Sequence, residues 1–398
     1  MQILLLSPYH GGSHQAWAEG YAAASGHKVT LLTLPAHFWK WRMHGGAVTL
    51  ARRWLETTPS TSPDLILATD ILDLTTFLAL TRGKTAGVPV VLYMHENQLT
   101  YPLPADPTTG PMRRQLGERD RHYAFINYVS MLAADRVFFN SQYHLDNFFS
   151  ALLPFLRHYP EYNELDTVEP LRQKSAVMSV GINLRRLDPP WVLNDPKDEP
   201  LILWNQRLEY DKNPEGFINV LVQLAAEGIP FRVALCGERF GQPGERWEKG
   251  VAALGDRVIH NGYAEDEVYR RLLWESELTV STAGHEYFGI SILEAIHCQT
   301  FPLLPARLSY PEIIPEAFHA DCLYRGRQDL LRRLRWALSD PAAARQVAER
   351  LASTAMVYDW SRLAPEYDAR LAQIVVSSIS GDDTRTSPSS TGGDLPPA

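Results

Sequence analysis

Two carboxylates stand out in the segment AGHEYFGISILEAI (283–296), where Glu286 and Glu294 flank Gly289 in otherwise apolar surroundings. A carboxylate buried without partners is costly, so each must face water or accept hydrogen bonds. The preceding LTVSTA (278–283) is typical of a strand, and GISILEAIH of a helix that begins near Gly289. The first amides of such a helix can bind a phosphate. Glu294 then either faces solvent or accepts hydrogen bonds from a ligand diol, and Glu286 lies where a sugar attached to that phosphate would be.

Two cations follow another expected strand, LILWNQ (201–206). Arg207 and Lys212 lie in NQRLEYDKNPE, where Asn213 can cap a helix and Pro214 fits its first turn. A strand-to-helix junction of this kind directs both cations towards a ligand. The alternative is a solvated basic pair beside the two carboxylates of the same segment.

Glycines follow the first expected strand in SPYHGGSH (7–14), before a helix expected from about Gln15. Gly11 and Gly12 let the backbone approach a ligand closely, and the helix start offers N–H groups to an anion. The segment is not a GxGxxG fingerprint, so a simple tight turn remains the alternative.

A polar cluster ends the expected strand in YMHENQ (93–98). His95, Glu96, Asn97 and Gln98 are poor core residues and well suited to sugar binding or acid–base chemistry. A lone histidine would more often be structural, but four polar side chains together favour a site. With the features above, the residues predict a nucleotide-sugar site.

The elements that must position these residues alternate between strand and helix. In the first half, apolar runs at 3–7, 28–34, 64–69, 89–96 and 136–141 predict strands of a parallel sheet covered on both faces. The pattern resumes after residue 200, with strands expected at 201–206, 231–237, 257–262 and 278–283 and a helix over 214–227. Both halves therefore read as doubly wound α/β domains, whose ligands bind at the carboxyl ends of the strands.

These elements divide the chain as follows: an acceptor-side domain over 1–183, a linker over 184–200, a nucleotide-sugar domain over 201–358, a helix over 359–376 that returns to the first domain, and a disordered polar tail over 377–398. A length of 398 residues suits two domains.

Composition excludes several classes of protein. With 45% hydrophobic and 21% charged residues, and no apolar run of about 18 residues, a membrane span is not expected. The start MQILLLSPYHGG reads as a strand and not a signal peptide, so we expect a cytoplasmic protein. Three dispersed cysteines without CxxC spacing predict neither a disulfide framework nor a zinc site. A net charge of −8 opposes a surface that binds nucleic acid everywhere but permits a local basic patch.

These segments resemble those of a known family. EYFGISILE is similar to the E-x7-E signature of the retaining glycosyltransferases of family 4, and NQRLEYDKNP to the Arg and Lys pair that meets the donor diphosphate. SAVMSVGINLRRLDP (175–189) resembles the interdomain passage of that family, and VIHNGYAEDEVYRRLLWESELTVST its stretch around the nucleotide base. The resemblance implies a GT-B fold, in which two Rossmann-like domains face a central cleft.

Further segments resemble one group within that family, the tRNA-queuosine α-mannosyltransferases. They are YHGGSH, LPAHFWKWRMHG (34–45), MHENQLTYP (94–102), ERDRHYAFINY (118–128) and WNQRLEYDKNPE (204–215). This resemblance implies transfer of mannose from GDP-mannose to the cyclopentenediol of queuosine at the wobble position of tRNA-Asp. The alternatives are a family 4 transferase with a small-molecule, lipid or glycan acceptor, a GT-B nucleotide-sugar epimerase, and a binding protein that has lost catalysis.

The resemblance also implies roles for individual residues. Arg207 and Lys212 would neutralise the diphosphate leaving group without a metal or other cofactor, Glu286 would hold the mannose hydroxyls, and His95 would contact the sugar or the reacting hydroxyl. These four form the expected catalytic set. Attack from the front face needs no carboxylate nucleophile, unlike the paired carboxylates of retaining glycosidases.

Donor binding is implied for Gly11, Gly12, Ser13, Arg207, Lys212, Tyr263 near the guanine, Phe288, Gly289, Ile290, Ser291 and Glu294 at the ribose. Acceptor binding is expected for His14, Trp41, Arg42, Glu96, Asn97, Gln98, Arg113, Arg114, Arg119, Arg121 and Asn140. The arginines and tryptophans could grip an anticodon loop through phosphate contacts and base stacking. Alternatively, the arginines belong to a charged helix start and the tryptophans of FWKWRMHGG are core.

Overall fold

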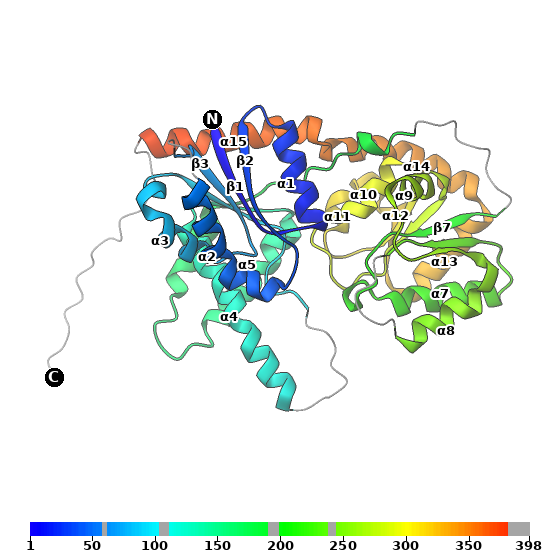
Figure 1. Cartoon of the computed structure of the whole chain (residues 1–398). Helices are drawn as coiled ribbons and strands as arrows, with labels where there is room; N and C mark the ends of the chain where they lie inside the picture. The colour runs from blue at the N-terminus through cyan, green and yellow to red at the C-terminus, as the bar shows by residue number, and fades with distance from the viewer. Residues whose placement is uncertain (58–61, 103–110, 190–198, 238–243, 381–398) are drawn as a thin grey trace.

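The structure is a computed structural model that describes residues 1–57, 62–102, 111–189, 199–237 and 244–380, without the side chains of 111–120 and 379. It holds two all-parallel sheets, one in each half of the chain (Figure 1). The strands of the first are β1 (Gln2–His10), β2 (Lys28–Pro35), β3 (Leu65–Thr69), β4 (Val90–Met94), β5 (Arg136–Phe139) and β6 (Ser175–Val177). Those of the second are β7 (Leu201–Trp204), β8 (Arg232–Leu235), β9 (Val258–Asn261), β10 (Leu278–Val280), β11 (Phe301–Pro305) and β12 (Leu323–Tyr324).

Helices connect the strands. The α-helices are α1 (Gly12–Ala24), α2 (Trp39–Thr57), α3 (Leu74–Thr85), α4 (Pro111–Ala133), α5 (Gln142–Leu156), α6 (Val168–Gln173), α7 (Pro214–Ala226), α8 (Glu245–Leu254), α9 (Asp266–Glu275), α10 (Ile290–His297), α11 (Tyr310–Ile313), α12 (His319–Cys322), α13 (Gly326–Ser339), α14 (Pro341–Ala355) and α15 (Trp360–Ser380). Short 3₁₀ turns are η1 (Leu165–Thr167), η2 (Arg185–Leu187), η3 (Tyr210–Lys212), η4 (Gly255–Arg257), η5 (Glu316–Phe318) and η6 (Met356–Tyr358).

The apolar strands are covered on both faces, as expected. Alternate side chains of β1 point to opposite faces. Ile3 and Leu5 join the core that includes residues of α1 and α15, and Leu4 and Leu6 join the core that includes residues of α2, α3 and α5. This double burial explains why the strands read as continuous apolar runs.

Each sheet has one point where the strand order reverses. The first sheet runs β2-β1-β3-β4-β5-β6 and the second β12-β11-β10-β7-β8-β9. The reversals lie between β1 and β3 and between β7 and β10. In open α/β sheets ligands bind outside the carboxyl ends of the strands at such points. The loops after β1, β3, β7 and β10 are therefore where the fold places a site.

The chain crosses between the domains twice, side by side. The Ile182 N–H donates to the Tyr358 carbonyl over 2.8 Å, and the Trp360 N–H donates to the Ile182 carbonyl over 3.0 Å. The Trp360 indole lies so close to Gly181 that a Cβ there would come within 2.4 Å of the ring. Glycine is thus needed at this crossing for packing.

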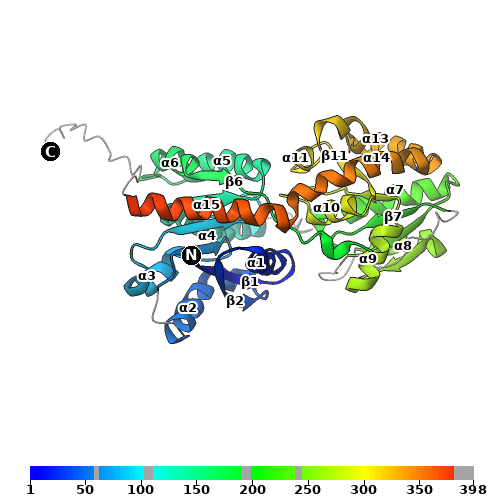
Figure 2. The same ribbon diagram turned by 90° about the horizontal axis from the view of Figure 1, so that it is seen from above.

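Helix α15 returns to the first domain and lies along α1 (Figures 1 and 2). The Trp17 indole N–H donates to the Tyr367 hydroxyl over 3.1 Å, and the Tyr21 hydroxyl donates to Asp368 over 2.8 Å. The helix continues to Ser380, so the expected tail boundary at 377 is wrong by four residues, and 381–398 lie outside the described residues.

Other boundaries also differ from the expectation. Helix α1 begins at Gly12 and not near Gln15, and β4 ends at Met94, which leaves His95 in the loop that follows. The strands β6, β11 and β12 were not predicted. Among the described residues, no helix combines the length and the apolar character that a membrane span requires.

Candidate active site

Lys212 lies at the end of the loop after β7 and is buried against the loop that follows β10. Its side chain is 9% exposed. The ammonium donates to the His285 carbonyl over 2.9 Å and lies 3.2 Å from Glu286 Oε2 and 3.1 Å from Asp211 Oδ2. Asn213 caps α7 with its side chain, as predicted, and fixes where the loop ends. The solvated alternative is therefore wrong for Lys212.

The ammonium of Lys212 stays charged despite its burial. Burial lowers the pKa of Lys212, but the charges of Glu286 and Asp211 outweigh burial, so the pKa is raised overall. For Glu286 the directions are opposite. Burial raises the pKa of this carboxyl, but the charge of Lys212 and its hydrogen bond lower it by more, so the Glu286 pKa is lowered overall. The two side chains form a buried ion pair that joins the loops after β7 and β10.

The loop that carries Glu286 is held by its own residues and by contacts from Ser309 and Tyr358. The Phe288 N–H approaches Glu286 Oε1 at 3.5 Å, and the Ser309 hydroxyl donates to the Phe288 carbonyl over 2.9 Å. The Phe288 ring is buried against Tyr358. Its side chain therefore supports the loop, and only its backbone remains for the donor contact that we expected.

The predicted phosphate site at the start of α10 has the expected backbone form. Gly289 precedes the helix at φ +107°, in the left-handed region that favours glycine, and no side chain caps the helix. Ile290 and Ser291 begin α10, and the Ser291 carbonyl accepts from the Asn205 amide over 2.7 Å. The first amides of α10 thus lie next to the loop of the two cations.

Glu294 is buried, so the solvent-facing alternative is wrong. The Arg186 guanidinium donates to its Oε1 over 2.7 Å, and the Tyr269 hydroxyl donates to its Oε2 over 2.8 Å. Arg186 also donates to Asp266 over 2.7 Å, and the Asn205 amide donates to the Tyr269 hydroxyl over 3.1 Å. Sequence reasoning missed Arg186 and Tyr269, although both lie within segments quoted for the family resemblance.

Arg207 is half-exposed, and its charge acts on ionisable residues of the first domain. Its guanidinium lies 3.2 Å from Glu209 Oε2. Burial raises the pKa of Glu96, and the charge of Arg207 offsets part of that rise. Burial, together with the charge of Arg207, lowers the pKa of His14 to about 4. Arg207 therefore faces residues that follow β4 and β1 across the interdomain junction.

Two neutral histidines from the first domain lie together at that junction. The rings of His14 and His95 are 4.3 Å apart, and the Trp17 ring meets His95 edge-on at 4.7 Å. Burial lowers the pKa of both. His14 Nδ1 and His95 Nε2 are buried and have no hydrogen-bond partner among the described residues. Buried polar atoms of this kind call for an external partner.

Asp70 is the acidic residue that the sequence analysis missed on this side. It follows β3, and its Oδ1 accepts from the His95 N–H over 2.9 Å. Burial, then the charge of Glu96, raises the pKa of Asp70 well above its usual value. The signal was present, because Asp70 ends the apolar run at 64–69, but a single acid after a strand is weak evidence.

The glycine turn after β1 owes its two glycines to different causes. A Cβ on Gly11 would come within 2.5 Å of the Ala36 Cβ, so the neighbouring loop requires this glycine. Gly12 has φ +54° and a Cβ there would meet nothing within 4 Å. Gly12 and Ser13 are exposed at the start of α1. The open side of the turn is therefore at Gly12.

Asn97 and Asn140, both expected to contact the acceptor, make hydrogen bonds within the protein. Asn97 is fully buried, its carbonyl oxygen accepts from the Leu99 and Thr100 N–H groups, and its amide donates to the Tyr287 hydroxyl over 2.8 Å. The Asn140 amide donates to the His95 carbonyl over 2.9 Å, and its oxygen meets His144 Nδ1 at 2.9 Å. Both hold the loops that carry the site.

Tyr287 joins the two domains. Its hydroxyl lies 2.6 Å from Thr100 Oγ1 as well as 2.8 Å from the Asn97 amide. Its ring stacks on His144, with centroids 3.9 Å apart. Because Tyr287 follows Glu286 directly, the loop of the buried ion pair is fixed to the loop of His95 and Glu96.

Two further contacts close the same junction. The Glu312 carboxylate of α11 accepts from the Gln142 N–H over 2.8 Å and the Tyr143 N–H over 2.5 Å, at the start of α5. The Tyr210 hydroxyl donates to the Pro102 carbonyl over 2.5 Å. The carboxyl edges of the two sheets are thus held against each other at several points.

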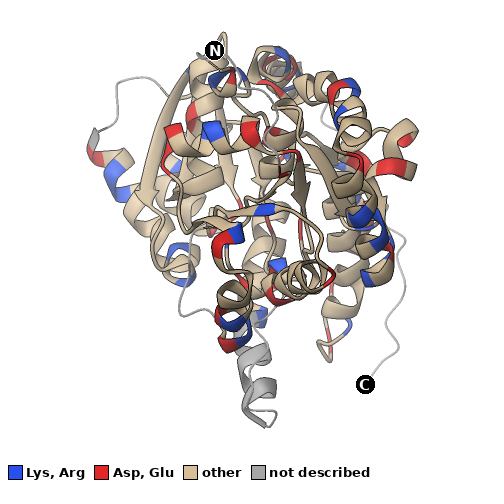
Figure 3. Cartoon of the chain, turned by 90° about the vertical axis from the view of Figure 1, so that its right-hand side faces the viewer, with Lys and Arg blue, Asp and Glu red and all other residues tan. Residues whose placement is uncertain are grey.

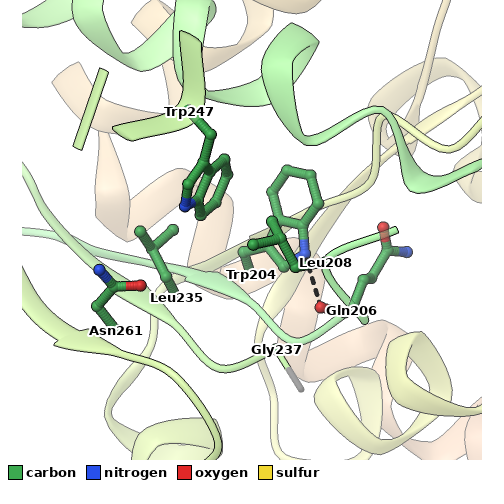
Figure 4. A pocket seen from close by; sticks show the side chains of 7 residues that line it. All are labelled: Trp204, Gln206, Leu208, Leu235, Gly237, Trp247 and Asn261. Carbon is green, nitrogen blue, oxygen red and sulfur yellow. Dashed lines mark hydrogen bonds between the residues drawn. The ribbon is translucent and has the colours of Figure 1, made fainter. Parts of the chain in front are cut away.

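A cavity lies at the carboxyl ends of β7, β8 and β9 (Figure 4). Its lining residues are Trp204, Gln206, Leu208, Leu235, Gly237, Trp247 and Asn261. Tyr263, expected near the base, follows β9 two residues after Asn261 and is exposed. Most of its lining side chains are apolar, and Gln206 and Leu208 of the lining flank Arg207 in the sequence.

The residues near the expected acceptor surface differ in exposure. Trp39 packs on Tyr123, with centroids 5.2 Å apart, whereas Trp41 is exposed. Arg42 donates to the Pro35 carbonyl over 3.2 Å, and Arg121 is exposed on α4. The core alternative for FWKWRMHGG is therefore correct for Trp39 and wrong for Trp41. The side chains of Arg113, Arg114 and Arg119 lie outside the described residues.

The chain matches two family models. Residues 2–182 match the model described as tRNA-queuosine alpha-mannosyltransferase N-terminal, and residues 188–354 match glycosyl transferases group 1. A tRNA-queuosine alpha-mannosyltransferase of Drosophila melanogaster is 32% identical over 323 residues, which span 79% of this chain and 82% of that relative. A GDP-mannose-dependent alpha-(1-6)-phosphatidylinositol dimannoside mannosyltransferase of Mycobacterium tuberculosis is 27% identical over 184 residues, 45% of this chain and 46% of that protein.

Solved structures resemble the whole fold at low identity. Sucrose-phosphate synthase from Thermosynechococcus elongatus has a TM-score of 0.69 at 17% identity, over 95% of this chain and all of that chain. The trehalose-6-phosphate synthase OtsA has a TM-score of 0.65 at 12% identity, over 94% and 99%. These similarities concern the fold alone, and they confirm the expected GT-B architecture of two Rossmann-like domains.

Proposed function

The chain belongs to the tRNA-queuosine alpha-mannosyltransferase family, and from that premise we propose that it moves mannose from GDP-mannose to the cyclopentenediol of wobble queuosine in tRNA-Asp. The observation that carries this is the 32% identity to a named relative over most of both chains, with a family model that matches the first domain. A nucleotide-sugar donor and a tRNA acceptor follow from the family. Guanine, mannose and tRNA-Asp are part of the proposal.

The buried ion pair is proposed to open when the donor binds. Lys212 Nζ would contact the diphosphate, and Glu286 would accept hydrogen bonds from mannose hydroxyls. Both groups are charged and lie 3.2 Å apart at the strand reversal, where the fold favours a ligand. Lys212 would exchange a carboxylate for the diphosphate, and Glu286 would exchange the ammonium for hydroxyl hydrogen bonds, so both buried groups keep polar partners.

Leaving-group stabilisation is assigned to the cations and the amides at the start of α10. The acceptor hydroxyl oxygen bonds to the anomeric carbon while the bond from that carbon to the phosphate oxygen breaks, with its electron pair going to GDP. The hydroxyl proton passes to a donor phosphate oxygen. Negative charge therefore grows on the diphosphate, where Lys212, Arg207 and the first amides of α10 stabilise it without a metal.

The ribose and the base of the donor are also assigned to residues near the diphosphate. Glu294 would bind the ribose hydroxyls, because Arg186 and Tyr269 fix its carboxylate at 2.7 and 2.8 Å beside α10. The base would lie near Tyr263. Gly12 and Ser13 would approach the phosphates from the first domain, since the turn is open at Gly12.

The neutral histidines are assigned to the sugar and the reacting hydroxyl. His95 Nε2 and His14 Nδ1 are buried, unpartnered within the described residues, and not protonated near pH 7 because burial lowers their pKa values. Such nitrogens can exchange hydrogen bonds with hydroxyls without adding charge. Glu96 and Gln98 lie on the same loop and complete the acceptor side of the proposal.

Incubation of the enzyme with GDP-mannose and queuosine-containing tRNA, followed by nucleoside analysis, tests this function. Mannosyl-queuosine should form in tRNA-Asp and not in a queuosine-free transcript of the same sequence. Transfer of mannose to a lipid or small molecule with no product on tRNA would overturn the acceptor. Parallel reactions with UDP-sugars test the donor.

A further inference from the structure

An exposed pair of aromatic side chains lies where α2 begins, at the carboxyl edge of the first sheet. Phe38 is 83% exposed and Trp41 is 61% exposed. Phe38 comes directly before α2, and the Trp41 and Arg42 N–H groups donate to its carbonyl over 2.8 and 3.1 Å. Phe38 was not singled out in the sequence, where it is one of three aromatics in FWKW.

The backbone of Phe38 is strained. Its φ is +51°, in the left-handed region that disfavours bulky side chains. Neither burial nor backbone preference accounts for a phenylalanine here, since glycine or asparagine would fit the conformation better. A strained backbone beneath an exposed ring next to the interdomain junction motivates a functional hypothesis.

Trp41 is held in a fixed orientation. A Cβ on Gly45, one turn further along α2, would come within 2.5 Å of the indole ring. Glycine inside a helix is unfavourable, so its presence lets the indole lie against the helix. The neighbouring Trp39 turns inwards and packs with Met43, Tyr123 and Ile126, which fixes α2 against α4.

The surface around the pair carries positive charge in an otherwise acidic chain. Figure 3 shows Lys and Arg interspersed with Asp and Glu along much of the ribbon. In contrast, residues 36–55 contain Lys40, Arg42, Arg52 and Arg53 and no carboxylate, and residues 121–133 of α4 contain Arg121 and no carboxylate. Glu56 follows at the end of α2 and pairs with Arg52, so the positive charge near Phe38 and Trp41 comes from Lys40, Arg42 and Arg121. The net charge of −8 therefore does not describe this surface.

The pair lies next to the proposed active site. Ala36, two residues before Phe38, packs directly against Gly11 of the donor-facing turn. Trp39 and Tyr9 both pack against the cluster that contains Ile71. Tyr9 lies near the end of β1 and Ile71 lies in the loop after β3, so this cluster is beside the first reversal point. A polymer whose reacting base enters the junction would pass over Phe38 and Trp41.

We propose that Phe38 and Trp41 form a stacking platform for unpaired bases of the tRNA anticodon loop, with the cations Lys40, Arg42 and Arg121 beside it contacting the phosphates. This inference rests on the proposed function and specifies how its acceptor is held. Unpaired bases stack on exposed aromatic rings, and Lys and Arg supply phosphate contacts. A platform beside the junction would hold the bases next to queuosine while queuosine itself turns towards His95.

Binding of queuosine-containing tRNA-Asp to Phe38→Ala and Trp41→Ala tests the platform. Each variant should lose about 5- to 150-fold in tRNA affinity, the range expected for one aromatic–base stack. GDP affinity should stay unchanged, because neither ring belongs to the donor site. Trp41→Phe, which keeps a stacking ring, should retain most of the affinity.

Two variants separate the platform from a general effect on folding. Tyr162 is also exposed, at 87%, with φ +46°, but lies beyond the carboxyl end of α5, away from the junction. Tyr162→Ala should leave tRNA affinity unchanged. Phe38→Gly should keep or raise the melting temperature, because it relieves the backbone, while it weakens tRNA binding.

The outcomes distinguish this inference from the proposed function. If the wild type mannosylates queuosine in tRNA and both alanine variants bind tRNA within twofold of it, the platform is wrong and the function stands. If the wild type forms no mannosyl-queuosine and does not bind tRNA, the function fails and the platform fails with it. Equal losses in Tyr162→Ala and Phe38→Ala would also overturn the platform.

Discussion

Replacing Tyr287 with phenylalanine removes one oxygen and two contacts that cross the interdomain junction. The hydroxyl lies 2.8 Å from the Asn97 amide and 2.6 Å from Thr100 Oγ1, in a buried setting. A hydrogen bond of this kind contributes about 0.5–1.5 kcal/mol net, so loss of both weakens the junction by about 1–3 kcal/mol. At about 1.4 kcal/mol per factor of ten, the closed arrangement loses about 5- to 150-fold relative to an open one.

This loss should appear in kcat/KM for tRNA more than in GDP affinity. Glu286 and Lys212 stay in place in Tyr287→Phe, so the donor residues of the second domain are intact. The loop of His95 and Glu96 is no longer fixed to them, and transfer needs both. We expect kcat/KM to fall at least fivefold, measured by nucleoside analysis at limiting tRNA.

Tyr210→Phe is the matched control. It removes the hydroxyl that donates to the Pro102 carbonyl at the same junction, but Tyr210 is 44% exposed and water can replace the contact. Its activity should remain within about twofold of the wild type. If Tyr287→Phe is also fully active, the buried contacts do not hold the catalytic arrangement and the reasoning fails.

Lys212→Ala should lower turnover by about 100-fold or more. It should also destabilise the fold by about 3–5 kcal/mol, because it leaves the Glu286 and Asp211 carboxylates buried without their cation. A folded variant with near-normal turnover would remove Lys212 from the mechanism. Glu294→Gln should raise the KM for the donor about tenfold, because a charged hydrogen bond is lost. Asp266→Asn alters the exposed partner of the same Arg186 and should change this KM little. Equal effects of the two variants would contradict the assignment of Glu294 to the ribose. Acidification should destabilise the protein through His14. The pKa of His14 is about 4 in the folded state and about 6.5 in the unfolded state. As the pH falls below 6.5, the unfolded state therefore takes up the proton first and is favoured. At pH 5 this amounts to about 2 kcal/mol, and His14→Gln should reduce the difference between urea midpoints at pH 7 and pH 5; an unchanged difference would show that His14 is not the group responsible.

The sequence identified the residues that follow strands at the reversal points. Periodicity located most of the strands, and parallel strands place their following loops at one edge, so Lys212, Glu286 and His95 could be placed near one another before any coordinates were known. The burial of Lys212 could not be predicted, because its partners Glu286 and His285 lie more than seventy residues away.

Long-range partners account for the other misses. Arg186 and Glu294 are 108 residues apart, and Asn97 and Tyr287 are 190 apart. No local pattern distinguishes an asparagine that joins two domains from one that binds a ligand. The same holds for Phe38, Trp39 and Trp41, where only the packing of α2 on α4 decides which ring turns inwards.

The most direct test of the central assignment is the mass of the wobble nucleoside after reaction. With GDP-mannose and queuosine-containing tRNA-Asp, the wild-type enzyme should convert queuosine into a nucleoside heavier by one hexose, and acid hydrolysis should release mannose. No mass change in tRNA-Asp, with an active donor and a folded enzyme, would contradict the account.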